Sequence, residues 1–90
     1  MRSLRWTGAF TKDVKRLAKR GNDLNKLDRI LNALQRNDAL PPAARPHLLS
    51  GEWVGAWDCH VANDWVLIYE LTDDEVRLLR TGTHADLFKR

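Results

Sequence analysis

The sequence predicts an α+β fold, in which an N-terminal strand and a helical hairpin pack on a mainly antiparallel sheet of four to five strands. Two amphipathic helical patterns occupy residues 10–36, and short strand-like segments joined by turns fill residues 48–81. Helices gathered at the start of a chain and strands at its end are typical of this class. Ninety residues suit one domain, which we assign to residues 1–90.

The first part of the chain is predicted to form a strand and two helices. An alternating segment at 3–6 predicts the strand. Gly21 is placed to end the first helix, and Asn22 or Asp23 is placed to cap the second. The apolar stripe of the first helix comprises Phe10, Val14, Leu17 and Ala18. The stripe of the second comprises Leu24, Leu27, Ile30, Leu31 and Leu34.

The remainder of the chain is predicted to form strands and turns. Prolines make residues 40–46 a loop, and a hairpin is expected to turn near Gly51. The apolar run 65–69 predicts a strand buried on both faces. The last strand would place Val76, Leu78 and Arg80 on one face. The other expected elements are arms at 48–52 and 53–57, strands at 57–61 and 76–81, turns at 62–64 and 72–75, and a helical turn at 84–88.

The composition excludes several classes of protein. No apolar stretch approaches the ~20 residues of a membrane span, and the N-terminus lacks the apolar region of a signal peptide, so we expect a cytosolic (cytoplasmic) protein without a membrane partner. The single cysteine, Cys59, cannot form an internal disulfide. No glycine-rich phosphate loop is present, so no nucleotide cofactor is predicted.

The positive charge is concentrated in the first part of the chain. Residues 1–36 carry ten Lys/Arg against three Asp, whereas residues 37–90 carry five Lys/Arg against nine Asp/Glu. A clustered basic surface is expected where a protein binds phosphate backbones. A solvated helix surface would show the same pattern, so charge alone leaves both interpretations open. The first-helix residues predicted to contact RNA are Lys12, Lys15, Arg16 and Lys19.

One cluster of titratable residues could carry chemistry. In an extended segment Asp58 and His60 point one way, while Trp57, Cys59 and Val61 point the other. With His47, Asp64 and His84, which adjoin strand ends, they form a set suited to acid–base catalysis near neutral pH.

RNA is the natural substrate for this set beside a basic surface. Its 2′-hydroxyl is an internal nucleophile, so the enzyme needs a base, an acid and cations, and no metal. A zinc site is the weaker interpretation, because Asp58-x-His60 is not a specific ligand spacing. Cys59 is a poor candidate nucleophile, since strand alternation turns it away from His60.

Five segments in order resemble the RelE/ParE superfamily of toxins, and among them the YafQ-like branch of bacterial type II toxin–antitoxin mRNA interferases. The similarity runs nearly end to end. The segments are Phe10-Thr11-Lys12-Asp13-Val14-Lys15, Leu40-Pro41 leading to His47-x-Leu49-x-Gly51-x-Trp53-x-Gly55, Asp58-x-His60, Asp64-Trp65-x-Leu67-Ile68-Tyr69, and Arg80-Thr81-Gly82-Thr83-His84-Ala85-Asp86-Leu87-Phe88.

The resemblance implies a ribosome-dependent endoribonuclease that cuts mRNA and is neutralised by an antitoxin. By this resemblance His47 is the base on the 2′-hydroxyl, and His84 or Asp64 is the acid. Asp58 and His60 would orient the partners and stabilise charge. The resemblance also implies that Phe88 positions the nucleotide, and we add Arg80 as a phosphate ligand by its position.

The implied partners are the cognate antitoxin, the ribosome with its rRNA, and mRNA. Operator DNA would be bound only through the antitoxin complex. One alternative is a ParE-like toxin that inhibits DNA gyrase by binding, although that function would not need three histidines and two aspartates. Another is a plain nucleic-acid-binding module, for which the basic helices would suffice.

Overall fold

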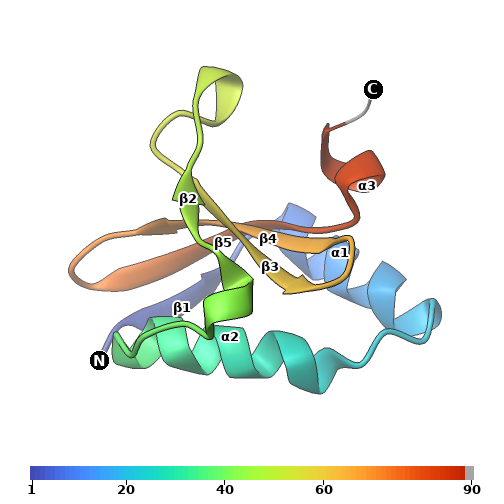
Figure 1. Ribbon diagram of the computed structural model, residues 1–90, viewed down its shortest axis with the longest axis horizontal. Helices are drawn as coiled ribbons and strands as arrows, with labels where there is room; N and C mark the ends of the chain where they lie inside the picture. Colours follow the sequence, from blue (N-terminus) through green and yellow to red (C-terminus); the bar gives the residue numbers. More distant parts are fainter. Residues whose placement is uncertain (89–90) are drawn as a thin grey trace.

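The computed structural model describes residues 1–88 and forms one five-stranded sheet with two long helices on one face (Figure 1). The strand order is β1-β5-β4-β3-β2, and β1 pairs with β5 in parallel while the other pairs are antiparallel. The elements are β1 Ser3–Trp6, α1 Gly8–Lys19, α2 Leu24–Arg36, the 3₁₀ helices η1 Pro42–Ala44 and η2 Gly51–Trp53, β2 His47–Leu48, β3 Trp57–Ala62, β4 Trp65–Leu71, β5 Glu75–Gly82 and α3 His84–Phe88. The predicted α+β class is therefore confirmed.

Short polar side chains set the starts of both long helices. The Thr7 hydroxyl accepts a hydrogen bond from the Phe10 amide at 3.2 Å. Asp23, one of the two predicted caps, accepts from the Asn25 amide at 3.0 Å. Such caps satisfy amides that have no partner within the helix. Between the helices, Gly21 adopts φ 86, a left-handed conformation that is accessible to glycine.

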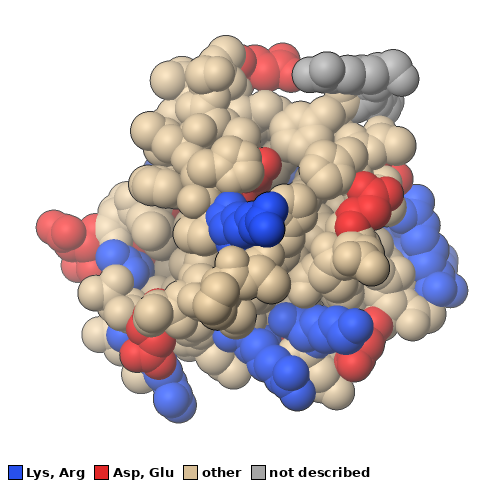
Figure 2. All heavy atoms as spheres, viewed as in Figure 1, with Lys and Arg blue, Asp and Glu red and all other residues tan. Residues whose placement is uncertain are grey.

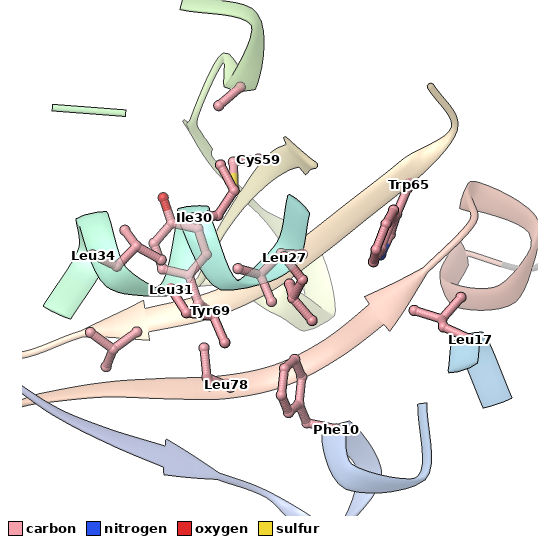
Figure 3. Close-up of a cluster of buried hydrophobic side chains, with 13 residues drawn as sticks. Phe10, Leu17, Leu27, Ile30, Leu31, Leu34, Cys59, Trp65, Tyr69 and Leu78 are labelled. Carbon is pink, nitrogen blue, oxygen red and sulfur yellow. The ribbon is translucent and has the colours of Figure 1, made fainter. Parts of the chain in front are cut away.

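The main core lies between the helices and the sheet (Figure 3). Apolar stripes of both helices pack on alternate residues of β3, β4 and β5. The core side chains labelled in Figure 3 are Phe10, Leu17, Leu27, Ile30, Leu31, Leu34, Cys59, Trp65, Tyr69 and Leu78. On the opposite face Val66 and Ile68 pack with Ala56 and Leu87. Both faces of β4 are thus covered, as its continuous apolar run predicts.

Two predictions about the strands are wrong in detail. The 51–53 segment forms η2 instead of a tight turn, so β2 is only two residues long and β3 begins at Trp57 instead of residue 53. In β5 the register shifts, because Leu78 is opposite Tyr69 whereas Arg80 is opposite Ile68. This bulge leaves Leu79 unpaired and breaks the alternation that would have put Arg80 on the face of Val76 and Leu78.

A buried carboxylate joins α1 to β5 beyond the end of β1. Asp13 is 2 % exposed, and its oxygens accept hydrogen bonds from Arg80 Nε at 2.6 Å, the Thr81 amide at 3.1 Å and Arg16 at 2.9 Å. Two guanidinium groups and a backbone amide therefore satisfy an acid that would otherwise be costly to bury.

None of the helices in residues 1–88 is long and apolar enough to cross a membrane.

Candidate active site

The face of the sheet opposite the long helices carries the predicted acid–base residues. Asp58 and His60 project from β3 on this side, while Cys59 points into the main core. The β2–β3 pairing sets His47 directly opposite Asp58. Leu87 packs α3 onto the same face of the sheet. This places His84 and Phe88, which are also in α3, on the face that carries Asp58 and His60.

The first pair consists of His47 and Asp58. His47 Nδ1 lies 3.0 Å from the Arg45 carbonyl oxygen and 3.1 Å from Asp58 Oδ1. Because a carbonyl oxygen only accepts, Nδ1 carries the hydrogen, and Nε2 of the neutral ring keeps its lone pair. The Asp58 side chain is 9 % exposed, and Oδ1 has no hydrogen bond from any described residue. Asp58 therefore faces the imidazole as a nearly buried acceptor.

The second pair consists of His84 and Asp64. Asp64 Oδ1 accepts hydrogen bonds from His84 Nδ1 at 2.7 Å and from the His84 amide at 3.1 Å. The hydrogen bond from the His84 ring, followed by the one from its amide, lowers the pKa of the Asp64 carboxyl. Asp64 adopts φ 47 in the β3–β4 turn, which aims its side chain at α3. The pair joins the β3–β4 turn to α3 through two residues that are 20 positions apart in sequence.

His60 lies in a row of rings between these elements. The centroids of His60 and His84 are 5.8 Å apart, and those of His84 and Phe88 are 6.0 Å apart. These separations are within the range of aromatic contacts, so the rings can help to hold one another in position. The structure thus brings His60, Asp64, His84 and Phe88 into one group beside the His47–Asp58 pair.

A capping interaction that the sequence prediction missed holds α3 in place. The Thr83 amide donates to Asp86 Oδ2 at 2.9 Å, and the Asp86 amide donates to the Thr83 hydroxyl at 3.0 Å. Arg20 at the end of α1 binds both Asp86 oxygens, at 2.7 and 3.1 Å. The Thr83-x-x-Asp86 spacing is the signal that could have revealed this capping box.

Replacing Asp86 with Asn should destabilise the protein in a pH-dependent way. Arg20 and the Thr83 amide hold the pKa of Asp86 well below the ordinary value of 3.8. The carboxylate therefore stabilises the fold above that value, and its contribution falls as pH drops from about 4 toward the lowered pKa. We expect Asp86→Asn to cost about 1 kcal/mol at neutral pH and progressively less in acid. Urea titrations at several pH values measure this, with exposed Asp73→Asn as the control; a pH-independent cost would contradict it.

Gly82 is needed for the same contact. It adopts φ 156, and a Cβ built on it would lie 2.8 Å from Asp86 Oδ2. Gly82→Ala should therefore displace Asp86 and α3, which carries His84, at a cost of about 1–3 kcal/mol. Gly8→Ala is the matched control, because a Cβ there meets nothing within 4 Å. Thermal unfolding of both variants tests this, and equal stability of the two would contradict it.

A cavity of about 400 Å³ opens beside His60 and Asp64, and Arg45 lines it. The sequence prediction did not include Arg45. Its φ of 44 and ψ of 63 are left-handed, so the chain turns sharply between η1 and β2. No sequence signal marked this position, because an arginine rarely adopts such a conformation.

The cations predicted to bind RNA are only partly available. Arg80 and Arg16 both bind Asp13, so Arg80 has a structural contact with α1, and its role as a phosphate ligand stays a prediction. Lys12, Lys15 and Lys19 lie on α1, which packs on the face of the sheet opposite the histidines. Their contact with RNA stays a prediction.

Among residues 1–88 no group of three or more His, Cys, Asp and Glu side chains is arranged to hold a metal ion. Cys59 is fully buried, and burial followed by the nearby Asp58 charge raises the pKa of its thiol to about 12. A thiol with so high a pKa is a poor nucleophile at neutral pH. Cys59 is therefore not a candidate nucleophile.

Comparison with known proteins identifies the family of this chain. The family model described as a bacterial toxin of type II toxin–antitoxin systems, YafQ, matches residues 2–89. The chain belongs to this family. It is 47% identical over 88 residues to the mRNA interferase toxin YafQ of Escherichia coli K12, covering 97% of this chain and 96% of that protein. It is also 35% identical over 83 residues to a putative toxin YafQ of Haemophilus influenzae, covering 84% of this chain and 81% of that protein.

Solved structures of similar toxins share the fold. The E. coli DinJ–YafQ toxin–antitoxin complex superposes with a TM-score of 0.89 at 46% identity, over 97% of both chains. A metal-bound toxin from Helicobacter pylori superposes with a TM-score of 0.91 at 31% identity, over 98% of this chain and 100% of that one. The predicted family and the predicted RelE/ParE-type fold are therefore confirmed.

Proposed function

We propose that this chain is an mRNA interferase: a ribosome-dependent endoribonuclease that uses the RNA 2′-hydroxyl as the nucleophile. The observation that carries the proposal is the presence of two imidazole–carboxylate pairs, His47–Asp58 and His84–Asp64, on one face of the sheet. Cleavage of this kind needs one group to take a proton and another to give one. The names of close relatives as mRNA interferases support the same activity.

His47 acts as the base in this proposal. Its Nδ1 is occupied by the Arg45 carbonyl, so the Nε2 lone pair is directed elsewhere and can accept the 2′-hydroxyl proton. The ring becomes positively charged when it does so. Asp58, 3.1 Å away and nearly buried, then stabilises a charge that exists only after proton transfer.

His84 acts as the acid. The lowered pKa of Asp64 keeps that carboxylate ionised at neutral pH, so it has no proton to give. Asp64 instead holds Nδ1 of His84 and leaves Nε2 free to protonate the departing 5′-oxygen. His60, in the row of rings, would stabilise phosphorane charge, and Phe88 would stack on a base.

A cognate antitoxin is the expected protein partner, since a structure of an E. coli relative contains the DinJ antitoxin. An acidic or amphipathic antitoxin segment would fit the basic surface of this chain. Operator DNA would then be bound only through that complex. Gyrase inhibition is the weaker candidate, because a binding surface does not require two imidazole–carboxylate pairs.

Cleavage assays with purified chain test ribosome dependence. The chain is mixed with mRNA alone, or with the same mRNA on ribosomes that carry a tRNA in the P site. We expect rapid cuts at in-frame codon positions on ribosomes and at least a hundredfold slower cleavage of free mRNA, because the ribosome would supply the positioning. Equal cleavage of both would contradict ribosome dependence, and no cleavage of either would contradict the proposed function.

A further inference from the structure

Two adjoining cavities with basic residues at their outer ends extend from His60 and Asp64 around the β3–β4 turn. The cavity beside His60 and Asp64 shares Val61, Ala62 and Asn63 with a second cavity of about 420 Å³. That second cavity reaches α2, where Lys26 and Arg29 line it. The two cavities therefore adjoin each other at the β3–β4 turn, one next to His60 and Asp64 and the other next to α2.

Cations stand at the outer ends of these two cavities. Arg45 lines the end next to His60, and Lys26 and Arg29 line the end on α2. None of the three makes an ion pair within residues 1–88, in contrast to Arg16 and Arg80, which are bound to Asp13. Figure 2 shows Lys and Arg side chains over α2, with Asp or Glu side chains beside them, and Lys or Arg atoms over the segment between η1 and β2. Three unneutralised cations along two adjoining cavities favour a polyanion.

We propose that Arg45, Lys26 and Arg29 form a phosphate-binding groove for the mRNA strand where it leaves the cleaved bond. This inference rests on the proposed function. Its geometric basis is adjacency, since Arg45 lines the cavity that contains His60 and Asp64, and Lys26 and Arg29 line the cavity next to it. The left-handed turn at Arg45 also links the groove to the base, because the Arg45 carbonyl orients the His47 ring.

The left-handed turn at Arg45 also bears on the role of its side chain. A left-handed conformation is unfavourable for a residue with a Cβ, and glycine or asparagine would adopt it more readily. The backbone conformation alone therefore does not explain an arginine here, and its guanidinium is the group with a role to fill. A guanidinium beside the scissile phosphate can bind two of its oxygens at once.

Binding of full-length protein to ribosomes carrying a non-cleavable, 2′-deoxy-substituted mRNA tests this groove without requiring catalysis. We expect Lys26→Gln/Arg29→Gln to weaken binding about tenfold and to reduce the slope of log affinity against log salt by about 1.4. Arg45→Asn, which keeps the left-handed turn, should weaken binding and also slow cleavage of ordinary mRNA. The control Arg5→Gln/Arg77→Gln removes two cations that pair with Glu75 at the far end of the sheet.

The outcomes separate the possible ligands. A loss of binding confined to ribosomes that carry mRNA supports the groove, provided that the control double variant binds like wild type. An equal loss on ribosomes without mRNA would assign these residues to ribosomal RNA and overturn the proposal. Unchanged ribosome binding with weakened antitoxin binding would assign them to the protein partner and would also overturn it. Failure of the wild-type chain to bind ribosomes would instead refute the proposed function, and this inference with it.

Discussion

His84→Ala should slow mRNA cleavage on ribosomes by about 10²–10⁴-fold, with almost no loss of stability. The rate falls because the variant lacks the proton donor for the departing 5′-oxygen. Stability is retained because the His84 side chain is 52% exposed and its removal frees only the exposed Asp64 carboxylate. Single-turnover cleavage, measured beside thermal unfolding, gives both quantities.

A second variant separates the acid from its positioning partner. Asp64→Asn keeps an oxygen near the His84 ring but removes the charge, so we expect a smaller loss of rate than for His84→Ala. Asp73→Asn, in the exposed β4–β5 turn, is the matched control and should cleave like wild type. Full activity of His84→Ala would show that this ring is not the acid.

Asp13→Asn should give the largest loss of stability of any single polar substitution in the core, about 3–5 kcal/mol. It leaves the Arg80 guanidinium, 28% exposed, without its carboxylate and disrupts the acceptors of Arg16 and the Thr81 amide. The change lies between α1 and β5, on the side of the sheet away from His60. Equilibrium urea unfolding measures the loss.

The matched control is Asp28→Asn on the exposed face of α2, where the carboxylate makes no ion pair with another described residue. That variant should unfold within about 0.5 kcal/mol of wild type. Equal stability of the two variants would show that the Asp13 cluster does not hold α1 to β5.

The parts of the site that follow from periodicity could be predicted from the sequence. Strand alternation put Asp58 and His60 on one face and Cys59 on the other, and the continuous apolar run of β4 indicated its two-sided burial. A helical turn at 84–88 was expected to place Leu87 or Phe88 on the sheet, and Leu87 is buried there. These features depend on local patterns that tertiary structure did not override.

Other parts depend on contacts between distant segments. The bulge at Leu79 shifts the register of β5, and no local pattern marks it. Asp13 is three residues after Phe10 and four before Leu17, so its place on the apolar stripe was visible, but its partner Arg80 is 67 residues away. Arg45 reaches the cavity only because the chain takes a left-handed turn there.

The measurement that tests the central claim most directly is the response of cleavage to one missing oxygen. An mRNA with a single 2′-deoxy nucleotide on the 5′ side of the mapped cut is placed on ribosomes and incubated with wild-type chain. The acid–base mechanism predicts that cleavage at that position is lost while cuts at other codons persist. Undiminished cleavage at the deoxy position would contradict it, because the nucleophile could not then be the 2′-hydroxyl that His47 is proposed to deprotonate.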